Sequence, residues 1–184
     1  MVARLLTAPS WLLHPLRRRA AREELRARAP RGILVLCHGN ICRSPLAAAL
    51  LSRALGPAGI RVGSAGFIGP DRSSPPAAVA AAARRGVDLS GHRSRLLTAD
   101  LVRGVDLIVV MDAAQRREVC DRFGRSPRDV IVLGDLDPAP IETRAIRDPV
   151  EQGPEVFEQS YARIDRCTQE LARALLRPQN ARPM

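Results

Sequence analysis

From Arg31 onward, short apolar runs alternate with segments of helical periodicity, and no other property of the chain limits its fold as strongly. Such alternation is typical of α/β proteins, in which helices connect the strands of a parallel sheet. A chain of 184 residues is long enough for one such domain with a substantial core. The pattern predicts strands over residues 32–37, 60–64, 106–111 and 129–133, and helices over residues 44–55, 75–85, 112–122 and 153–176.

The last predicted helix has one apolar stripe. Its members recur at helical spacing, which indicates a face packed on the core. We therefore interpret Tyr161, which lies in the stripe, as a core residue and not as a site residue. The stripe consists of Phe157, Tyr161, Ile164, Thr168, Leu171 and Leu175.

A loop between the first predicted strand and the first predicted helix carries a thiol and a guanidinium. It reads Cys37-His38-Gly39-Asn40-Ile41-Cys42-Arg43-Ser44-Pro45. Backbone N–H groups at a helix N-terminus and the fork of Arg43 suit a tetrahedral oxyanion. The same positive environment favours the thiolate form of Cys37. A nucleophile inside an anion cradle is what cleavage of a phosphate monoester through a phosphocysteine requires.

This loop closely resembles the signature of the low-molecular-weight protein tyrosine phosphatases, Cys-x-Gly-Asn-x-Cys-Arg-Ser-Pro, and matches every defined position. The resemblance covers a domain of residues 31–177, between a basic extension (1–30) and a flexible tail (178–184). It implies a flavodoxin-like, four-stranded parallel sheet in the order 2-1-3-4, with helices on both faces and the loop at the carboxyl edge. It also implies a phosphoric monoester hydrolase that needs neither a cofactor nor a metal.

The resemblance assigns a role to each residue type in the loop. Cys37 would be the nucleophile, Arg43 the phosphate clamp, and Ser44 the hydroxyl donor to the sulfur. Asn40 would hold the loop in shape from a left-handed backbone conformation, which Asn tolerates better than most residues. The phosphate-binding residues would be His38, Gly39, Asn40, Ile41, Cys42, Arg43 and Ser44.

Two further segments, residues 64–66 and 91–95, also resemble segments of the family. The resemblance implies that Ser64 and His92 form hydrogen bonds with Asn40 and thereby stiffen the loop. Asp112 follows the third predicted strand and opens a helical stretch, so we interpret it as a helix cap.

Asp148 is the candidate general acid. The oxygen that leaves a phosphate ester needs a proton, so a carboxylic acid should face the thiol. Asp148-Pro149 precedes the last predicted helix and matches the Asp-Pro element of the family. One or two aromatic residues usually follow that element and contact the substrate ring, but Val150 and Glu151 stand here. Phe67 could substitute by packing against the ring, so phosphotyrosine recognition is weakened while the phosphate chemistry is not.

The four cysteines are not spaced as a disulfide framework, and a thiolate nucleophile implies a reducing compartment, so we expect the protein in the cytoplasm. Cys42 lies close enough in sequence to form a reversible disulfide with Cys37, which would protect the nucleophile from oxidation. A buried small residue is an equally good interpretation of Cys42.

Residues 1–30 differ in composition from the rest. Residues 1–31 hold eight arginines and two glutamates, a balance of +6 within a formal net charge of +10. Trp11, Leu12, Leu13 and Leu16 form an apolar patch that is too short to span a bilayer and is placed unlike a secretory signal. Residues 16–29 would form a positively charged helix. We favour a solvated segment, with membrane-surface contact or an acidic partner as alternatives. No aromatic platform or basic groove indicates a nucleic-acid partner.

Other functions of the same scaffold are less consistent with the sequence. Thioredoxin-coupled arsenate reductases need two additional thiols, but only Cys120 lies in the expected region, and Cys167 falls in an apolar stripe. Protein-arginine phosphatases tend to carry Thr where this chain has Ile41. A phosphate-binding module would not need Asp148, and a metal site built from Cys37, His38 and Cys42 lacks a second pair of ligands.

We therefore predict a protein tyrosine phosphatase. Its partner would be a tyrosine-phosphorylated protein. The resemblance is to bacterial members, some of which act on tyrosine kinases of exopolysaccharide production, and this pathway is an analogy only.

Overall fold

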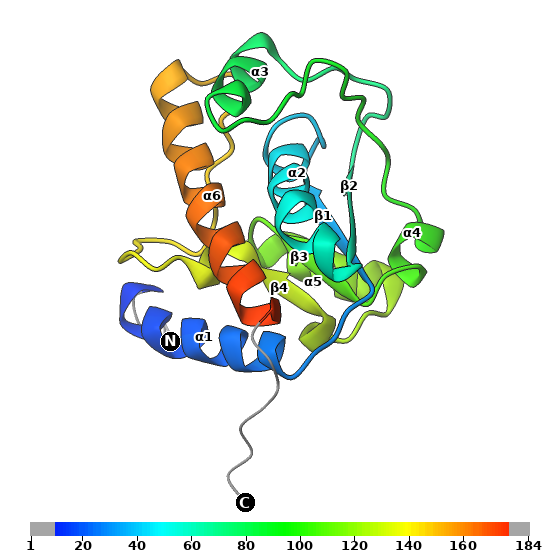
Figure 1. Cartoon of the computed structure of the whole chain (residues 1–184), viewed down its shortest axis with the longest axis vertical. Coiled ribbons are helices and arrows are strands. Elements are labelled where there is room, and N and C mark those ends of the chain that lie inside the picture. Colours follow the sequence, from blue (N-terminus) through cyan, green and yellow to red (C-terminus); the bar gives the residue numbers. More distant parts are fainter. Residues whose placement is uncertain (1–9, 177–184) are drawn as a thin grey trace, which may run out of the picture.

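The computed structural model describes residues 10–176, in which a four-stranded sheet carries helices on both faces (Figure 1). All strand pairings are parallel, and the strand order is β2-β1-β3-β4. The predicted fold class is therefore confirmed. The strands are β1 (Gly32–Cys37), β2 (Arg61–Gly66), β3 (Leu107–Val110) and β4 (Val130–Val132).

The central strand β1 is buried along its whole length, so its side chains build both cores of the protein. Ile33, Val35 and Cys37 belong to one hydrophobic cluster, while Leu34 and Leu36 belong to the other. This division follows from the two-residue period of a strand, and an uninterrupted apolar run is typical of parallel strands covered on both faces.

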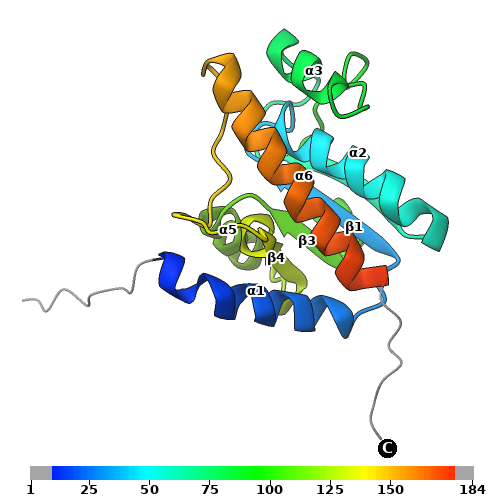
Figure 2. The ribbon, with the colours of Figure 1, turned by 60° about the vertical axis from the view of Figure 1, so that its left-hand side comes forward.

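Helices cover the two faces unequally (Figure 2). α2 (Arg43–Leu55), α3 (Pro76–Ala83) and α6 (Pro154–Leu176) pack on the larger cluster, and α4 (Ala99–Arg103) and α5 (Ala113–Phe123) on the smaller one. The predicted stripe of α6 is buried from Phe157 to Leu171, whereas Leu175 is only partly buried.

The predicted elements from Arg31 onward lie within two residues of the observed ones, whereas α4 and three short 3-10 helices, at residues 56–58, 127–129 and 133–136, were not predicted. β2 extends to Gly66, two residues beyond the prediction, because Gly66 still pairs with Cys37. The helix α4 was not predicted, since five residues are too few to show a period. Thr98 starts it by accepting a hydrogen bond from the Leu101 N–H.

α1 (Ser10–Arg26) packs across the C-terminal part of α6 and beside the 3-10 helix η3 (Leu133–Leu136) (Figures 1 and 2). Its inner side is formed by His14, Ala21 and Leu25, which are buried and follow one another at spacings of seven and four residues. The Nε2 atom of His14 lies 3.0 Å from the Asp137 carbonyl oxygen, to which it donates a hydrogen bond.

Ion pairs add to this packing. Arg18 contacts the Glu170 carboxylate at 2.6 Å, and Arg22 approaches the same group at 3.9 Å. Burial raises the pKa of Glu170, but hydrogen bonds from Arg173 and Arg18 outweigh burial and leave this pKa below its ordinary value. The interpretation of this region as a solvated segment is therefore wrong for residues 10–26, and the helix starts six residues earlier than predicted. Residues 1–9 and the predicted tail 178–184 lie outside the described residues.

The packing of α1 predicts the effect of truncating Leu25, whose side chain is completely buried. Leu25→Ala is expected to lower the free energy of unfolding by about 2–5 kcal/mol, because it removes buried methyl groups and leaves a cavity. Leu16→Ala on the exposed side of the same helix is the matched control and should change it by about 0.5 kcal/mol at most. Urea denaturation measures both, and equal effects would contradict the packing of α1.

Among the described residues, no helix combines the length and the hydropathy of a membrane span.

Candidate active site

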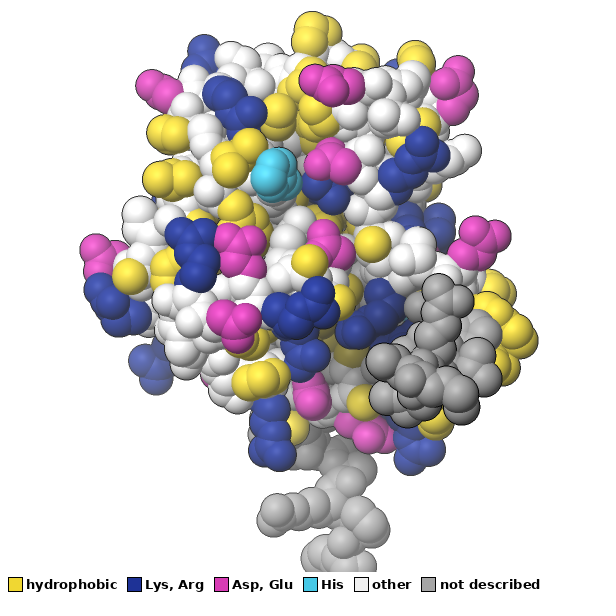
Figure 3. Space-filling model, turned by 180° about the vertical axis from the view of Figure 1, so that it is seen from behind, with side chains coloured by type: hydrophobic (Ala, Val, Ile, Leu, Met, Phe, Trp, Pro, Cys, Tyr) yellow, Lys and Arg dark blue, Asp and Glu magenta, His cyan; other side chains and the backbone are white. Residues whose placement is uncertain are grey.

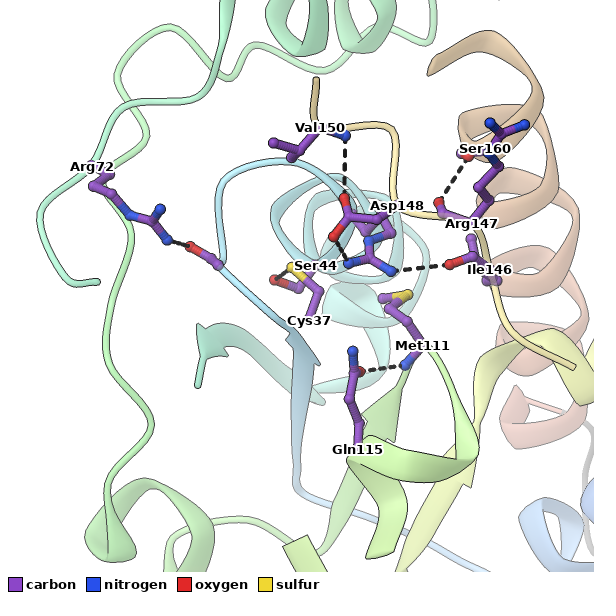
Figure 4. Close-up of polar contacts among 12 residues, drawn as sticks. Cys37, Ser44, Arg72, Met111, Gln115, Ile146, Arg147, Asp148, Val150 and Ser160 are labelled. Atoms are coloured by element: carbon purple, nitrogen blue, oxygen red, sulfur yellow. Dashed lines mark hydrogen bonds and ion pairs between the residues drawn. The ribbon is translucent and has the colours of Figure 1, made fainter. Parts of the chain in front are cut away.

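The loop between β1 and α2 follows the carboxyl end of the central strand, where open α/β sheets bind ligands (Figure 4). Asn40 has a φ angle of 51°, the left-handed conformation predicted for it. Gly66 of β2 permits the loop to approach the sheet, since a Cβ atom there would lie 2.8 Å from the Asn40 nitrogen. A side chain at Gly66 would therefore displace the loop backbone.

The buried side chain of Asn40 connects the loop to two other segments. Its Nδ2 atom donates to the Ser44 Oγ at 2.8 Å and to the Ser64 Oγ at 2.9 Å. Its Oδ1 atom accepts from the Arg95 N–H at 2.8 Å, and its carbonyl oxygen accepts from His92 Nε2 at 2.7 Å. The structure thus brings together Asn40, Ser64 and His92 as expected, and the contact with Arg95 is an addition.

Most carbonyl groups of the loop are engaged with partners outside it. The Phe67 and Ile68 N–H groups donate to His38, the Arg72 Nη2 atom donates to Gly39, and the Tyr161 hydroxyl donates to Cys42. By contrast, within the part of the chain that the structure describes, no backbone N–H of residues 38–42 has a hydrogen-bond partner. Free amides that surround one small volume form an anion-binding concavity.

The thiol of Cys37 lies where β1 ends and this loop begins. The Cys37 Sγ atom is 3.1 Å from the Ser44 Oγ atom, and both are buried (Figure 4). The Ser44 oxygen accepts a hydrogen bond from Asn40, so its own O–H is free to donate to another acceptor. The Ala65 carbonyl oxygen is 3.5 Å away, which is long for a hydrogen bond, so the sulfur is the better acceptor.

The second loop cysteine and the tyrosine below it are buried groups. Burial, followed by the neighbouring Cys37, raises the pKa of the Cys42 thiol to about 12. Burial is also the main cause that raises the pKa of Tyr161. Both groups are therefore neutral near pH 7. The interpretation of Tyr161 as core is confirmed, and its hydroxyl additionally holds the Cys42 carbonyl at 3.1 Å.

Arg43 joins the loop to the candidate acid. Its side chain is buried, its Nη1 atom donates to the Ile146 carbonyl at 3.0 Å, and its Nη2 atom pairs with the Asp148 carboxylate (Figure 4). The Arg43 Nε atom is buried and has no hydrogen-bond partner among the described residues. One N–H of the guanidinium is thus available to an anion, and another is shared with Asp148.

The segment that carries Asp148 is fixed at several points. The Ile146 N–H donates to the Met111 carbonyl at the end of β3, and the Ser160 hydroxyl of α6 donates to the Arg147 carbonyl at 2.9 Å (Figure 4). Arg163 of α6 donates to the carbonyl groups of residues 143 and 145. These contacts place the carboxylate beside the loop, although more than a hundred residues separate Asp148 from Arg43.

The substrate wall has little aromatic surface. Val150 and Glu151 follow Asp148-Pro149, and Val150 is only partly buried. Phe67 packs against the smaller core, so its contact with a substrate ring stays a prediction. Ile68, the residue after Phe67, is 43% exposed and is thus the large apolar side chain of this segment that solvent reaches.

Sequence reasoning did not find the partners of the loop carbonyls. Every residue has a backbone carbonyl group, so the sequence does not show which of these groups accepts a hydrogen bond from a distant side chain. For Tyr161 a signal did exist, because the hydroxyl of a buried tyrosine usually has a partner.

Asp112 is the helix cap that we expected, since its carboxylate accepts from the Gln115 N–H at 2.8 Å. Within residues 10–176, no three His, Cys, Asp or Glu side chains are grouped to hold a metal ion.

The family model of the low molecular weight phosphotyrosine protein phosphatases matches residues 32–181 of the chain. A probable low molecular weight protein-tyrosine-phosphatase, EpsP of Ralstonia solanacearum, is 43% identical over 136 residues, which are 73% of this chain and 88% of EpsP.

Solved structures agree with this match. The tyrosine phosphatase AmsI of Erwinia amylovora superposes with a TM-score of 0.73 at 32% identity and covers 81% of this chain and 95% of its own. A cysteine mutant of the YwlE arginine phosphatase with a phosphorylated active-site serine gives a TM-score of 0.69 at 27% identity, covering 78% of this chain and 95% of its own.

Proposed function

Because the chain belongs to the low molecular weight phosphotyrosine protein phosphatase family and is thus a hydrolase, we propose that it cleaves phosphotyrosine in proteins through a phosphocysteine intermediate. The observation that carries this proposal is the set of loop amides without hydrogen-bond partners that follows Cys37, together with the unpaired Nε–H of Arg43. Such a site holds the equatorial oxygens of a phosphoryl group while the sulfur lies below the phosphorus.

In the first step, the Cys37 sulfur attacks phosphorus and the bond from phosphorus to the tyrosine oxygen breaks. Asp148 gives its proton to the departing oxygen, so that a neutral phenol leaves. Arg43 and the loop amides hold the charge of the three equatorial oxygens. In the second step, Asp148 accepts a proton from water, the water oxygen attacks phosphorus, and the bond between sulfur and phosphorus breaks. The Ser44 hydroxyl, 3.1 Å away, stabilises the thiolate that departs.

We propose a tyrosine-phosphorylated protein in the cytoplasm as the substrate. A bacterial tyrosine kinase of exopolysaccharide production is the candidate suggested by family analogy. Val150 stands where the family usually has an aromatic residue, so we expect recognition to depend on protein contacts around the phosphotyrosine as well as on the ring.

Phosphoarginine is the alternative substrate, because YwlE, an arginine phosphatase, is among the similar structures. Ile41 in the loop favours the ester, since a bulky apolar side chain is unfavourable beside a guanidinium. Turnover of phosphotyrosine and phosphoarginine peptides of one sequence, measured side by side, tests this choice. We expect faster cleavage of the phosphotyrosine peptide, and the reverse order would overturn the proposed substrate.

Arsenate reduction is disfavoured by the state of the remaining thiols. Burial, followed by the charge of Asp137, raises the pKa of Cys167 to about 12, so this side chain is a poor relay nucleophile. Cys120, which is partly exposed on α5, then remains as a single relay thiol where the arsenate reductases need two.

The role of Asp148 predicts a dependence on the leaving group. Asp148→Ala should reduce kcat by about a hundred- to ten-thousand-fold on alkyl phosphates, whose oxygen cannot leave without a proton. The loss should be much smaller on nitrophenyl phosphate, which leaves as a stable anion. Steady-state kinetics on both substrates decide this, with Asp165→Ala, an aspartate of α6, as the control. An equal loss on both substrates would exclude the acid role.

A further inference from the structure

α1 presents an outer surface that the chemistry of the phosphate site does not use. The family match starts at residue 32, so this helix is an addition to the phosphatase domain. Its inner side is fixed to the protein by His14, Ala21 and Leu25 and by the contacts of Arg18 and Arg22 with Glu170. The orientation of its outer side is therefore fixed as well.

The first half of this outer side is apolar. Four of the seven large hydrophobic side chains that are exposed among the described residues lie within six positions here: Trp11 (59%), Leu12 (51%), Leu13 (39%) and Leu16 (66%). Figure 3 shows hydrophobic side chains gathered at the edge of the molecule where α1 begins. Apolar side chains that are concentrated in this way, and not scattered, indicate an interaction surface.

The second half is basic. A shallow groove along α1 is lined by Pro15, Arg18, Arg19, Arg22, Glu23 and Arg26. Arg26 has no carboxylate partner among the described residues, and its Nε atom is buried without a hydrogen bond. Within residues 10–176, Arg19 pairs only with Glu23 on the same helix, where both side chains are well exposed. Such a pair is weak and leaves the arginine able to bind another anion.

The apolar and basic halves lie on the same side of the molecule. Trp11, Pro15, Arg18, Arg22 and Arg26 follow one another at spacings of three or four residues, so they form one row along the flank of the helix. Arg18 and Arg22 of this row also contact Glu170, so Arg26 and the outer Arg19 are the arginines most available to another anion. Leu12, Leu16 and Arg19 are their neighbours on the outer side. A partner that covers this surface must bury the apolar side chains at one end and carry negative charge opposite the arginines.

We propose that the outer side of α1 is a docking surface for an anionic lipid bilayer. Leucine side chains enter the acyl boundary, tryptophan is preferred at the interface, and arginine forks bind the phosphate groups of lipids. A second copy of the chain fits less well, because a symmetric pairing would place the arginines against either a second arginine row or apolar side chains, and neither offers negative charge. An acidic protein would match the arginines but would leave the four apolar side chains without an apolar environment.

Docking through this surface leaves the phosphate site open. α1 lies at the lower end of the molecule in Figures 1 and 2, whereas the loop between β1 and α2 lies in the upper half. The proposal does not depend on the substrate, since bilayer binding can be measured without any phosphate ester.

Trp11 allows a direct test, because it is the single tryptophan of the chain and lies inside the surface. The full chain is titrated with vesicles of phosphatidylcholine alone or with phosphatidylglycerol added. We expect a blue shift of the tryptophan emission and co-sedimentation with the anionic vesicles only, both weakened by salt. An unshifted emission with anionic vesicles, or equal binding to neutral ones, would overturn the proposal.

Variants at the exposed Leu12, Leu16 and Arg19 and at the partly buried Arg26 identify the binding surface, because none of the four belongs to the buried side of α1. Leu12→Ser with Leu16→Ser should lower the partition coefficient at least ten-fold, and Arg19→Gln with Arg26→Gln about twenty-fold, near five-fold for each arginine. Leu96→Ser and Arg61→Gln, exposed elsewhere, are the matched controls and should bind as the wild type does. Equal losses in the controls would contradict the assignment.

The other occupants are distinguished in the same samples. Light scattering without lipid that shows a dimer, lost in the Leu12→Ser, Leu16→Ser variant, would assign the surface to a second copy and overturn lipid docking. Binding of polyglutamate through the same arginines, together with no binding of vesicles, would assign it to an acidic protein and overturn lipid docking as well.

Discussion

Cys37→Ser is expected to abolish turnover, with a loss in kcat of about a million-fold, because a serine hydroxyl at this position has no base to ionise it. The concavity should survive, since the loop amides, Arg43 and the Asn40 contacts do not involve the sulfur. The variant should therefore still bind inorganic phosphate or vanadate, which isothermal titration measures.

The matched control is Cys120→Ser on α5, the same exchange at a partly exposed thiol, which should retain full activity. The inactive Cys37→Ser protein also serves as a trap for phosphoproteins from a cell extract. Retention of phosphotyrosine proteins would support the substrate class. Substantial activity of Cys37→Ser would exclude a phosphocysteine pathway, whereas loss of phosphate binding would show that the sulfur is needed to shape the site.

Arg43→Lys should lower kcat/KM by about a thousand-fold or more, even though the positive charge is retained. A guanidinium reaches the Ile146 carbonyl and an anion at the same time, and it can contact two phosphate oxygens. An ammonium group offers one compact charge and cannot make both contacts. Steady-state kinetics on nitrophenyl phosphate measure the loss, since that substrate needs little help from the acid.

Arg53→Lys is the control for this exchange, because Arg53 is exposed and, among the residues that the structure describes, donates only to the carbonyl groups of Arg85 and Gly86. It should leave kcat/KM unchanged. If Arg43→Lys kept a rate within ten-fold of the wild type, charge alone would be sufficient and the fork geometry would not matter. Phosphate inhibition of the Arg43→Lys protein should weaken in parallel with the rate, since both depend on the same contacts.

The sequence allowed the centre of the site to be predicted because its parts are local or belong to a specific motif. Cys37, Asn40, Arg43 and Ser44 lie in one short loop, and the apolar run before them identifies the strand that positions it. The contacts of Asn40 with Ser64 and His92 followed from resemblance, and the structure contains both. The role of each residue in turnover stays a prediction.

The remaining supports could not be predicted because they connect distant groups. Tyr161 reaches the Cys42 carbonyl across 119 positions, and Arg43 reaches the Ile146 carbonyl across 103. The packing of α1 was missed for a related reason. Its many arginines suggested solvent, but the carboxylates that receive them, Asp135 and Glu170, lie far along the chain.

The contact between Arg43 and Asp148 has a consequence for the timing of the reaction. The Asp148 carboxylate is paired with the same guanidinium that an incoming ester must contact. A bound ester competes with Asp148 for the Arg43 guanidinium, and the carboxylate leaves this contact when phosphate oxygens take its place. Substrate binding and the release of Asp148 from Arg43 are thus one event, so the carboxyl group becomes available at the moment when an ester is in place.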